Sequence, residues 1–275
     1  MDYSPVGGTP CRSKTKGDFM SKAASIFSLI LLFTVSSCGL VPLYYGNTFQ
    51  PFVSDFEDGT TGVWGLEQGR PGLIAVVTNP VRTGTYAVKF TILPGVTWGS
   101  GNRTEMKYFN IDPYGEEVYY GWSCMLAPGY TDNGLWQIIG QWHDQPDPFA
   151  DESWSSFPKN SPPLSINYTS NRVYLVVIHS GIKNKTMWEY GVPVGYGQWF
   201  DVAVHVKWSM LSDGFVEAWI NGTNLYPERI YCPTVVNRIG NYLKIGLYRD
   251  ENAQGSNVVY YDNVKIGKTL TEVQP

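Results

Sequence analysis

The chain has 275 residues and a formal net charge of −4 at pH 7, with 20 Lys and Arg against 24 Asp and Glu. No cluster of Lys or Arg offers a footprint for phosphates, which argues against nucleic acid as a partner. Aromatic residues make up 15% of the chain and charged residues only 16%, a composition that suits both a β-rich core and a groove whose rings stack on sugars.

The N-terminal segment has the features of a targeting signal. Lys22 precedes an apolar run at 26–35 that is too short to span a bilayer but suits a secretory signal. The sequence Val-Ser-Ser-Cys at 35–38 resembles the lipobox of bacterial lipoproteins, in which the cysteine is lipidated. We therefore predict a leader and signal peptide at 1–38, with lipid-anchored Cys38 at a bacterial cell envelope as the only membrane contact. An ordinary cleaved signal, giving a secreted protein, is the alternative.

Residues 39–51 are predicted to be a tether, and 52–270 one globular domain. In this domain, short runs rich in β-branched and aromatic residues alternate with Gly, Pro, Asn and Asp. The runs lie at 73–78, 86–93, 118–126, 173–179, 200–208, 215–221 and 258–266. Many short strands with turn signals between them predict an antiparallel sandwich or barrel.

A hairpin at 200–221 narrows the fold class. Apolar and polar residues alternate along 200–208, so Phe200 and Trp208 lie on one face and Asp201 and Lys207 on the other. A turn at 212–214 follows, and the chain returns as a second strand. The hairpin resembles one in lectin-like jelly rolls. We therefore predict an all-β fold, a β-jelly roll sandwich of two antiparallel sheets.

Three other stretches alternate in the same way: 103–105, 141–143 and 242–248. Each would present its polar side chains on one face of a strand. These side chains are Arg103 and Glu105, Gln141 and His143, and Lys244 and Tyr248. If the three strands are neighbours, one surface gathers groups that can bind an acidic sugar chain and move protons on it. The spacing alone does not show that they are neighbours.

Cleavage of a uronic-acid polymer by elimination makes three demands on a catalyst. It must neutralise the sugar carboxylate, supply a base for the proton at C5, and protonate the leaving oxygen at C4. Arg and Gln are fixed donors for the carboxylate, and His or Tyr can transfer the protons. A nearby Lys helps to hold a phenol partly ionised.

The three stretches resemble the signature strands of jelly-roll polysaccharide lyases. Arg-Thr-Glu, Gln-Trp-His and Tyr-Leu-Lys-Ile-Gly-Leu-Tyr look like the corresponding strands of alginate lyases. The segments 121–123, 162–164 and 260–263 look closer to the heparin lyase I and glucuronan lyase group. The likeness covers roughly 52–270 and implies a concave substrate groove. It also implies that the partner is an anionic polysaccharide, cut by a monomeric enzyme.

The resemblance also implies roles for single residues. Arg103 and Gln141 would bind and neutralise the substrate carboxylate. His143 would be the base or a further neutralising group. Tyr248 would donate a proton to the leaving oxygen, and on some substrates would act as both acid and base.

Four further residues complete the expected substrate-binding set. Lys244 would contact substrate or tune Tyr248, and Glu105 would orient Arg103 through a charge-assisted pair. Arg249 and Trp142, next to the catalytic positions, are expected to contact substrate. Trp142 stands where alginate lyases carry Ile or Val, which leaves alginate itself in doubt as the substrate.

Glu57 and Asp262 resemble acidic positions that hold a structural calcium ion in many jelly rolls. Calcium takes six to eight oxygens, of which the sequence identifies two or three, and the alternative is that these acids cap turns. Catalysis itself is predicted to need no cofactor. Cys124 and Cys232 are the two cysteines of the predicted mature domain. The sequence is compatible with a disulfide between them and with two buried thiols.

The irregular stretch 144–163 follows His143 directly, and we expect it to form a wall or lid of the groove.

Two other classes of function remain. A non-catalytic carbohydrate-binding protein would have no use for a proton donor beside a base. A glycoside hydrolase would need two carboxylates about 5–10 Å apart, and its usual strand pattern is absent.

Overall fold

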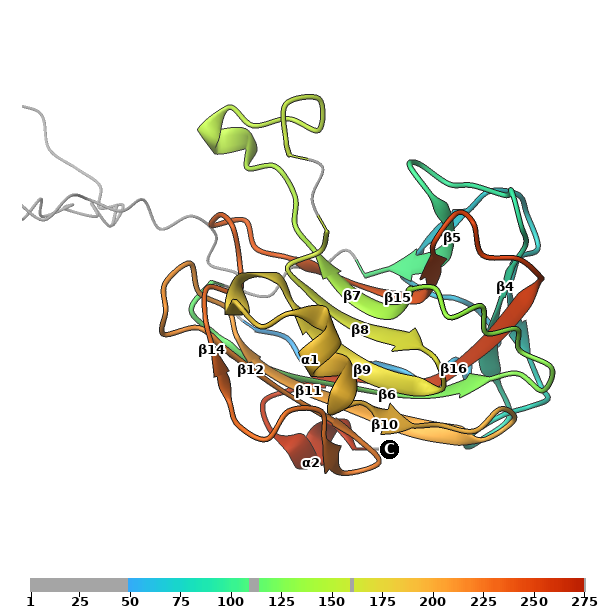
Figure 1. Ribbon diagram of the computed structural model, residues 1–275. Helices are drawn as coiled ribbons and strands as arrows, with labels where there is room; N and C mark the ends of the chain where they lie inside the picture. Colours follow the sequence, from blue (N-terminus) through green and yellow to red (C-terminus); the bar gives the residue numbers. More distant parts are fainter. Residues whose placement is uncertain (1–48, 109–113, 159–160, 275) are drawn as a thin grey trace, which may run out of the picture. The chain divides into compact units, whose positions relative to one another are not determined.

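Residues 49–108, 114–158 and 161–274, the part that this computed structural model describes, contain two antiparallel β-sheets stacked face to face (Figure 1). The seven-stranded sheet has the order β10 (Val192–Pro193), β9 (Arg172–Val177), β8 (Leu164–Thr169), β7 (Gln137–His143), β15 (Tyr242–Arg249), β5 (Asn102–Lys107), β2 (Gly65–Gln68). The main path of the nine-stranded sheet is β13 (Thr223–Asn224), β12 (Phe215–Ile220), β11 (Trp199–Lys207), β6 (Glu117–Leu126), β16 (Asn257–Gly267), β4 (Ala87–Ile92), β3 (Ile74–Val77). β1 (Phe52–Ser54) pairs with β16, and β14 (Ile230–Tyr231) with β12.

The predicted jelly-roll sandwich is confirmed, and each of the seven runs expected from the sequence contains a strand. The alternation in 200–208 has the expected cause: Phe200, Val202, Val204 and Val206 are buried between the sheets. β11 pairs with β12 on one side and β6 on the other. The run expected at 173–179 ends earlier, because residues 178–180 form the short 3-10 helix η2 (Ile178–Ser180).

Aromatic side chains dominate the core between the sheets. Trp142 of β7 lies with its ring centroid 4.9 Å from that of Tyr120 and 6.0 Å from that of Trp122, both on β6. Trp208, 6.4 Å from Trp142, donates a hydrogen bond from its indole N–H to the Tyr120 hydroxyl. Such pairs bury large apolar areas, although the indole N–H groups of Trp122 and Trp142 are buried without a hydrogen-bond partner. Most of the aromatic excess in the composition is therefore explained by packing.

Helices are short in the described chain: η1 (Pro148–Ala150), η2, α1 (Asn184–Glu189) and α2 (Leu270–Val273). None is long and apolar enough to cross a bilayer. The predicted signal peptide, Cys38 and residues 39–48 of the predicted tether lie outside the described residues, so those assignments stay predictions. Cys124 and Cys232 are both buried and free, so the disulfide left open by the sequence does not form.

Candidate functional site

The three strands singled out in the sequence are neighbours in the seven-stranded sheet. β15 lies between β7 and β5. Its Tyr248 is opposite Arg103 of β5, and its Lys244 is opposite Gln141 of β7. The adjacency on which the site prediction depended is therefore present.

A groove of about 670 Å³ lies over these strands. All four side chains predicted to be catalytic, Arg103, Gln141, His143 and Tyr248, line it. The other described lining residues are Ser100, Trp136, Ile138, Trp154, Phe157, Pro158, Ser161, Pro162, Ser165, Asn167, Val176 and Ile178. Lining residues come from both ends of β7 and from its neighbours in the sheet, β5, β15, β8 and β9.

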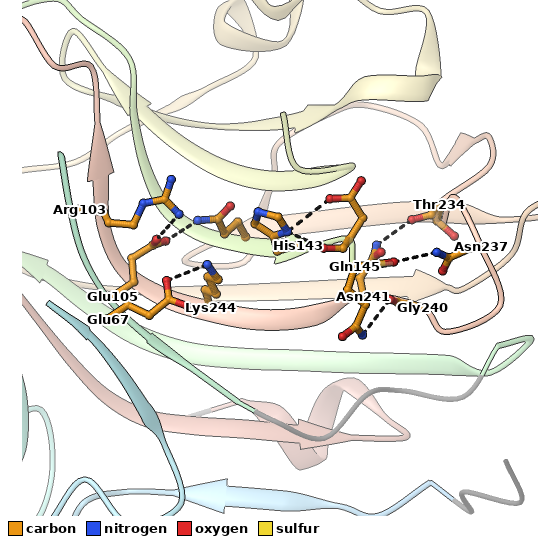
Figure 2. A network of polar contacts seen from close by, with 12 residues as sticks. Glu67, Arg103, Glu105, His143, Gln145, Thr234, Asn237, Gly240, Asn241 and Lys244 are labelled. Carbon is orange, nitrogen blue, oxygen red and sulfur yellow. Dashed lines mark hydrogen bonds and ion pairs between the residues drawn. The ribbon is translucent and has the colours of Figure 1, made fainter. Parts of the chain in front are cut away.

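Glu105 connects the two groups expected to neutralise the substrate. One of its carboxylate oxygens faces Nη1 of Arg103 at 3.5 Å, and the other accepts a hydrogen bond from the Gln141 side-chain amide (Figure 2). Arg103 is 7% exposed, and its Nε has no hydrogen-bond partner. The carboxylate thus fixes both donors, and the guanidinium keeps one buried N–H without a partner. A buried, unpaired donor of this kind is costly unless an acceptor reaches it.

Tyr248 is held by the groups around its ring. The Arg103 guanidinium lies over it, with Cζ 3.8 Å from the ring centroid. Trp136 meets the same ring edge to face, at 5.1 Å and 84°. Gly101 provides the space behind it, because a Cβ at that position would lie 2.5 Å from Cε2 of Tyr248. The phenol therefore has a defined place in the groove beside the guanidinium.

The main chain fixes the tautomer of His143. Its Nδ1 lies 2.6 Å from the carbonyl oxygen of Asp144 and 3.3 Å from the Asp144 carboxylate (Figure 2). A carbonyl oxygen only accepts, so Nδ1 carries the hydrogen, and the lone pair of the neutral ring is on Nε2. Tyr242 stacks on the imidazole at 5.5 Å. Burial raises the pKa of the Tyr242 phenol, with Glu67 and Glu105 adding to the effect, so this phenol stays protonated.

Lys244 has a partner that the sequence did not indicate. Its ammonium lies 2.8 Å from the carboxylate of Glu67 on β2, and Lys244 is only 3% exposed (Figure 2). Lys107 approaches the same carboxylate at 3.7 Å. Lys244 is thus held in a buried ion pair and is not among the groove-lining residues, which argues against the expected contact with substrate. Its expected influence on Tyr248 stays a prediction. Glu67 was missed because its strand, four residues long, is too short for a period to be read.

Two expected substrate contacts are contradicted by the structure. Trp142 is fully buried in the core, on the face of β7 opposite to the groove. Arg249 is also buried, with its Nε donating to the Asn102 side chain at 2.6 Å and its Nη2 to the Gly255 carbonyl at 2.9 Å. Both predictions ignored the strand alternation, which turns the neighbours of Gln141 and Tyr248 to the other face.

Gly246, between Lys244 and Tyr248 on β15, lies at a bulge in the strand. Its φ is +130°, and a Cβ there would collide with the Thr104 carbonyl group of β5. The pairing of β15 with β7 shifts register between Ile245 and Tyr248. The buried Tyr261 hydroxyl reaches this bulge and donates to the Gly246 carbonyl at 2.7 Å. The glycine is therefore required by the backbone.

Several groove residues were not found from the sequence. Ser165 and Asn167 of β8 share one strand face, and the Ser165 hydroxyl donates to the Asn167 side-chain oxygen at 2.6 Å. Their alternation in Leu164–Thr169 is a signal that could have identified them. Trp154, Phe157 and Pro158 come from the segment expected to be a wall or lid, and they line the groove. In Figure 1 this segment, between β7 and β8, rises above the sheet.

The predicted calcium ligands hold a loop. The Glu57 carboxylate accepts hydrogen bonds from the backbone N–H groups of Thr85 and Tyr86, which lower its pKa. Asp262 accepts from those of Arg82 and Thr83. No group of three or more His, Cys, Asp and Glu among the described residues is arranged to hold a metal. The donors found fall short of the six to eight oxygens of a calcium site, so calcium stays a prediction.

Comparison with known proteins gives the family. The sequence profile described as Polysaccharide lyase matches residues 56–265. No curated protein matches the chain. An endo-β-1,4-glucuronan lyase from the fungus Trichoderma reesei is similar in structure, with a TM-score of 0.66 and 23% identity over 81% of this chain and 97% of that one.

Two other solved structures share the fold. The alginate lyase Aly36B has a TM-score of 0.53 and 13% identity, covering 82% of this chain and 98% of its own. The catalytic domain of a glycoside hydrolase family 131 protein from Coprinopsis cinerea has a TM-score of 0.54 and 16% identity, covering 77% of this chain and 85% of its own. At these identities the structures support the jelly roll alone. The family profile, in contrast, spans the three signature strands, and it establishes that the chain belongs to the polysaccharide lyase family.

Proposed function

We propose that this lyase cleaves a uronic-acid polysaccharide, glucuronan-like or of the alginate or heparin type, by β-elimination. One observation supports this most directly: Arg103, Gln141, His143 and Tyr248 all line one groove. These are the groups that elimination next to a carboxylate requires.

The reaction would proceed without a cofactor. Arg103 and Gln141, held by Glu105, bind the uronate carboxylate and stabilise the charge that develops when the C5 proton leaves. Nε2 of His143 takes that proton. The electron pair of the C5–H bond forms the C4–C5 double bond, the C4–O bond breaks, and the Tyr248 hydroxyl protonates the departing oxygen. The products are an unsaturated uronate end and a new free sugar end.

The charge of the groove favours a substrate with one carboxylate at the cleavage point. Among the described residues that line it, Arg103 is the one Lys or Arg. Lys244 and Lys107 are held by Glu67. A heavily sulfated chain would find little compensation here, so a glucuronan-like polymer is the preferred substrate and heparin the least suitable of the three.

The two alternative functions are less well supported. No Asp or Glu is found among the described residues lining the groove, whereas a glycoside hydrolase needs a pair of carboxyl groups there. A binding protein has no need for the proton-transfer groups. We further propose that the enzyme acts as a monomer on an anionic polysaccharide outside the cell, anchored through lipidated Cys38 or secreted.

The test is an assay of unsaturated uronate ends by ultraviolet absorbance, with glucuronan, alginate, heparin and hyaluronan as substrates. We expect absorbance to rise with glucuronan and to be lost in Tyr248→Phe, which keeps the ring and its stacking. Reducing ends formed without that absorbance would instead identify hydrolysis. Binding without either product would identify a carbohydrate-binding protein.

A further inference from the structure

We propose that Trp136 and Trp154 are sugar-stacking platforms at the two ends of the groove, so that the enzyme holds the polymer on both sides of the bond it cuts. This inference rests on the proposed function, because it assigns the parts of the groove that flank the reacting sugar. Neither residue takes part in the elimination itself.

Both tryptophans are exposed in a way that packing does not explain. Trp136 is 38% exposed and Trp154 58%, although both belong to the groove lining. The indoles of the core, such as Trp122 and Trp142, are fully buried. Large aromatic side chains left open in a cavity are typical of ligand contact.

The two residues flank the candidate proton-transfer groups. Trp136 directly precedes β7 and meets the Tyr248 ring edge to face at 5.1 Å. Trp154 follows the other end of β7 and meets the His143 ring at 6.1 Å and 64°. β7 has seven residues, so the platforms are separated by on the order of 20 Å along the strand. That length accommodates several sugar units.

The segment that carries Trp154 is held in place by hydrogen bonds with residues between β14 and β15. The Asn237 side-chain amide donates to the Gln145 carbonyl at 2.7 Å (Figure 2). The same amide donates to the Glu152 carboxylate at 3.0 Å. Gln145 in turn donates to the Gly240 carbonyl at 3.3 Å (Figure 2). The segment that presents Trp154 is therefore anchored on both sides of η1, and this order reduces the entropy cost of binding.

The chemistry of the groove leaves stacking as the main source of binding away from the cleavage point. Arg103 supplies the one Lys or Arg charge among the described lining residues, and it lies beside Tyr248. Sugars further along must therefore be bound by neutral contacts. A pyranose has a face of C–H groups, and the negatively polarised face of an indole attracts such groups while covering a large apolar area. Ser165 and Asn167 can add hydrogen bonds from β8.

The experiment compares wild type with Trp154→Ala and Trp136→Ala on the polymer that wild type cleaves best and on size-fractionated oligosaccharides of it. Trp154→Phe keeps an aromatic face. Trp98→Ala is the matched control, because Trp98 is 45% exposed and is not part of the groove lining. The measured quantity is the ratio of kcat/KM for long substrates to kcat/KM for the shortest one cleaved.

We expect each alanine variant to lower this ratio roughly three- to tenfold, the range for one aromatic contact. Trp154→Phe should keep most of the ratio, and Trp98→Ala all of it. In Trp136→Ala, loss of support for Tyr248 would lower the rate for substrates of every length. Such a general fall leaves the ratio unchanged. Unchanged ratios in both alanine variants would overturn the inference and leave the proposed elimination intact. A wild type that releases no unsaturated product from any polymer would refute the proposed function, and this inference with it.

Discussion

The guanidinium of Arg103 lies over the ring of Tyr248, with Cζ 3.8 Å from the ring centroid. The group expected to bind the carboxylate thus also positions the group expected to protonate the leaving oxygen. The two side chains come from paired strands, since Tyr248 of β15 is directly opposite Arg103 of β5. A planar cation suits this place, because it can stack on a phenol and still direct its N–H groups along its edge.

We therefore predict that Arg103→Lys impairs the enzyme although the positive charge is kept. An ammonium has no flat face to stack on Tyr248 and cannot bind a carboxylate with two parallel N–H groups. Loss of one charge-assisted hydrogen bond costs about 2 kcal/mol, or roughly thirtyfold in kcat/KM. Initial rates on the best polymer measure it. Arg70→Lys, at an exposed position outside the groove lining, is the control. Wild-type rates in Arg103→Lys would contradict the stacking argument.

Glu105 should act through Arg103 and Gln141, and this can be separated from a role in folding. In Glu105→Gln the size is kept, but one acceptor oxygen becomes an NH₂ group, so one of the two donors loses its partner. We expect about a tenfold loss of kcat/KM, mainly as a higher KM. Combined with Gln141→Ala, the losses should be smaller than the sum of the two single effects in free energy. Strict additivity would show that Glu105 and Gln141 act independently.

The ion pair between Lys244 and Glu67 should contribute to stability. Lys244→Met leaves the Glu67 carboxylate buried with only Lys107, at 3.7 Å, nearby. We expect a loss of roughly 2–4 kcal/mol in the free energy of unfolding, measured by urea denaturation. The double variant Glu67→Leu and Lys244→Met removes both charges and should recover most of that loss. If the double variant is instead less stable than Lys244→Met, the ion pair itself stabilises the fold, and its role is more than to avoid an unpaired buried charge.

These contacts also show how far the sequence could lead. Alternation within single strands predicted which side chains share a face, and Arg103, Gln141, His143 and Tyr248 do line one groove. That the three strands of the site are neighbours could be expected only from the resemblance to lyases, because periodicity carries no information on which strands pair. The same alternation, applied strictly, would have placed Trp142 and Arg249 in the interior.

What the sequence could not provide depends on short or irregular segments. Glu67 lies on a strand of four residues. Trp154 lies in a segment with no period, and Trp136 just ahead of a strand. The left-handed backbone of Gly246 arises from a bulge whose carbonyl is bound by Tyr261, more than ten residues away. Each of these is a tertiary effect, in which a distant side chain decides what a local pattern leaves open.

Acid should weaken the attachment of the loop that Glu57 holds. Hydrogen bonds from the N–H groups of Tyr86 and Thr85 lower the pKa of Glu57 in the folded protein. A carboxyl whose folded pKa lies below its unfolded value contributes stability that is complete above the unfolded value and is lost as the pH falls through the folded one. The Tm difference between wild type and Glu57→Gln should therefore shrink as the pH is lowered below the usual pKa of glutamate. Parallel Tm curves across that range would contradict the assignment.

Gly101 offers the sharpest test of how Tyr248 is positioned. A Cβ at residue 101 would lie 2.5 Å from Cε2 and 3.1 Å from the hydroxyl oxygen of Tyr248. Gly101→Ala should therefore displace the ring and lower kcat by about tenfold or more, the scale of a misplaced proton donor. Gly99→Ala is the control in the same turn. Its φ is +56° and no atom lies within 4 Å of its Cβ position, so alanine there strains the backbone without touching Tyr248.

The two variants should consequently affect different quantities: Gly99→Ala the Tm, and Gly101→Ala mainly kcat. Gly99→Ala should lower the Tm, because an alanine at positive φ costs about 1 kcal/mol, and should keep kcat. Gly101→Ala should lower kcat more than its change in Tm accounts for. Near-ultraviolet circular dichroism, which reports the packing of Tyr248 against Trp136, should change in Gly101→Ala alone. Equal losses of kcat in both variants would mean that the turn as a whole, and not the space left by Gly101, determines where the phenol lies.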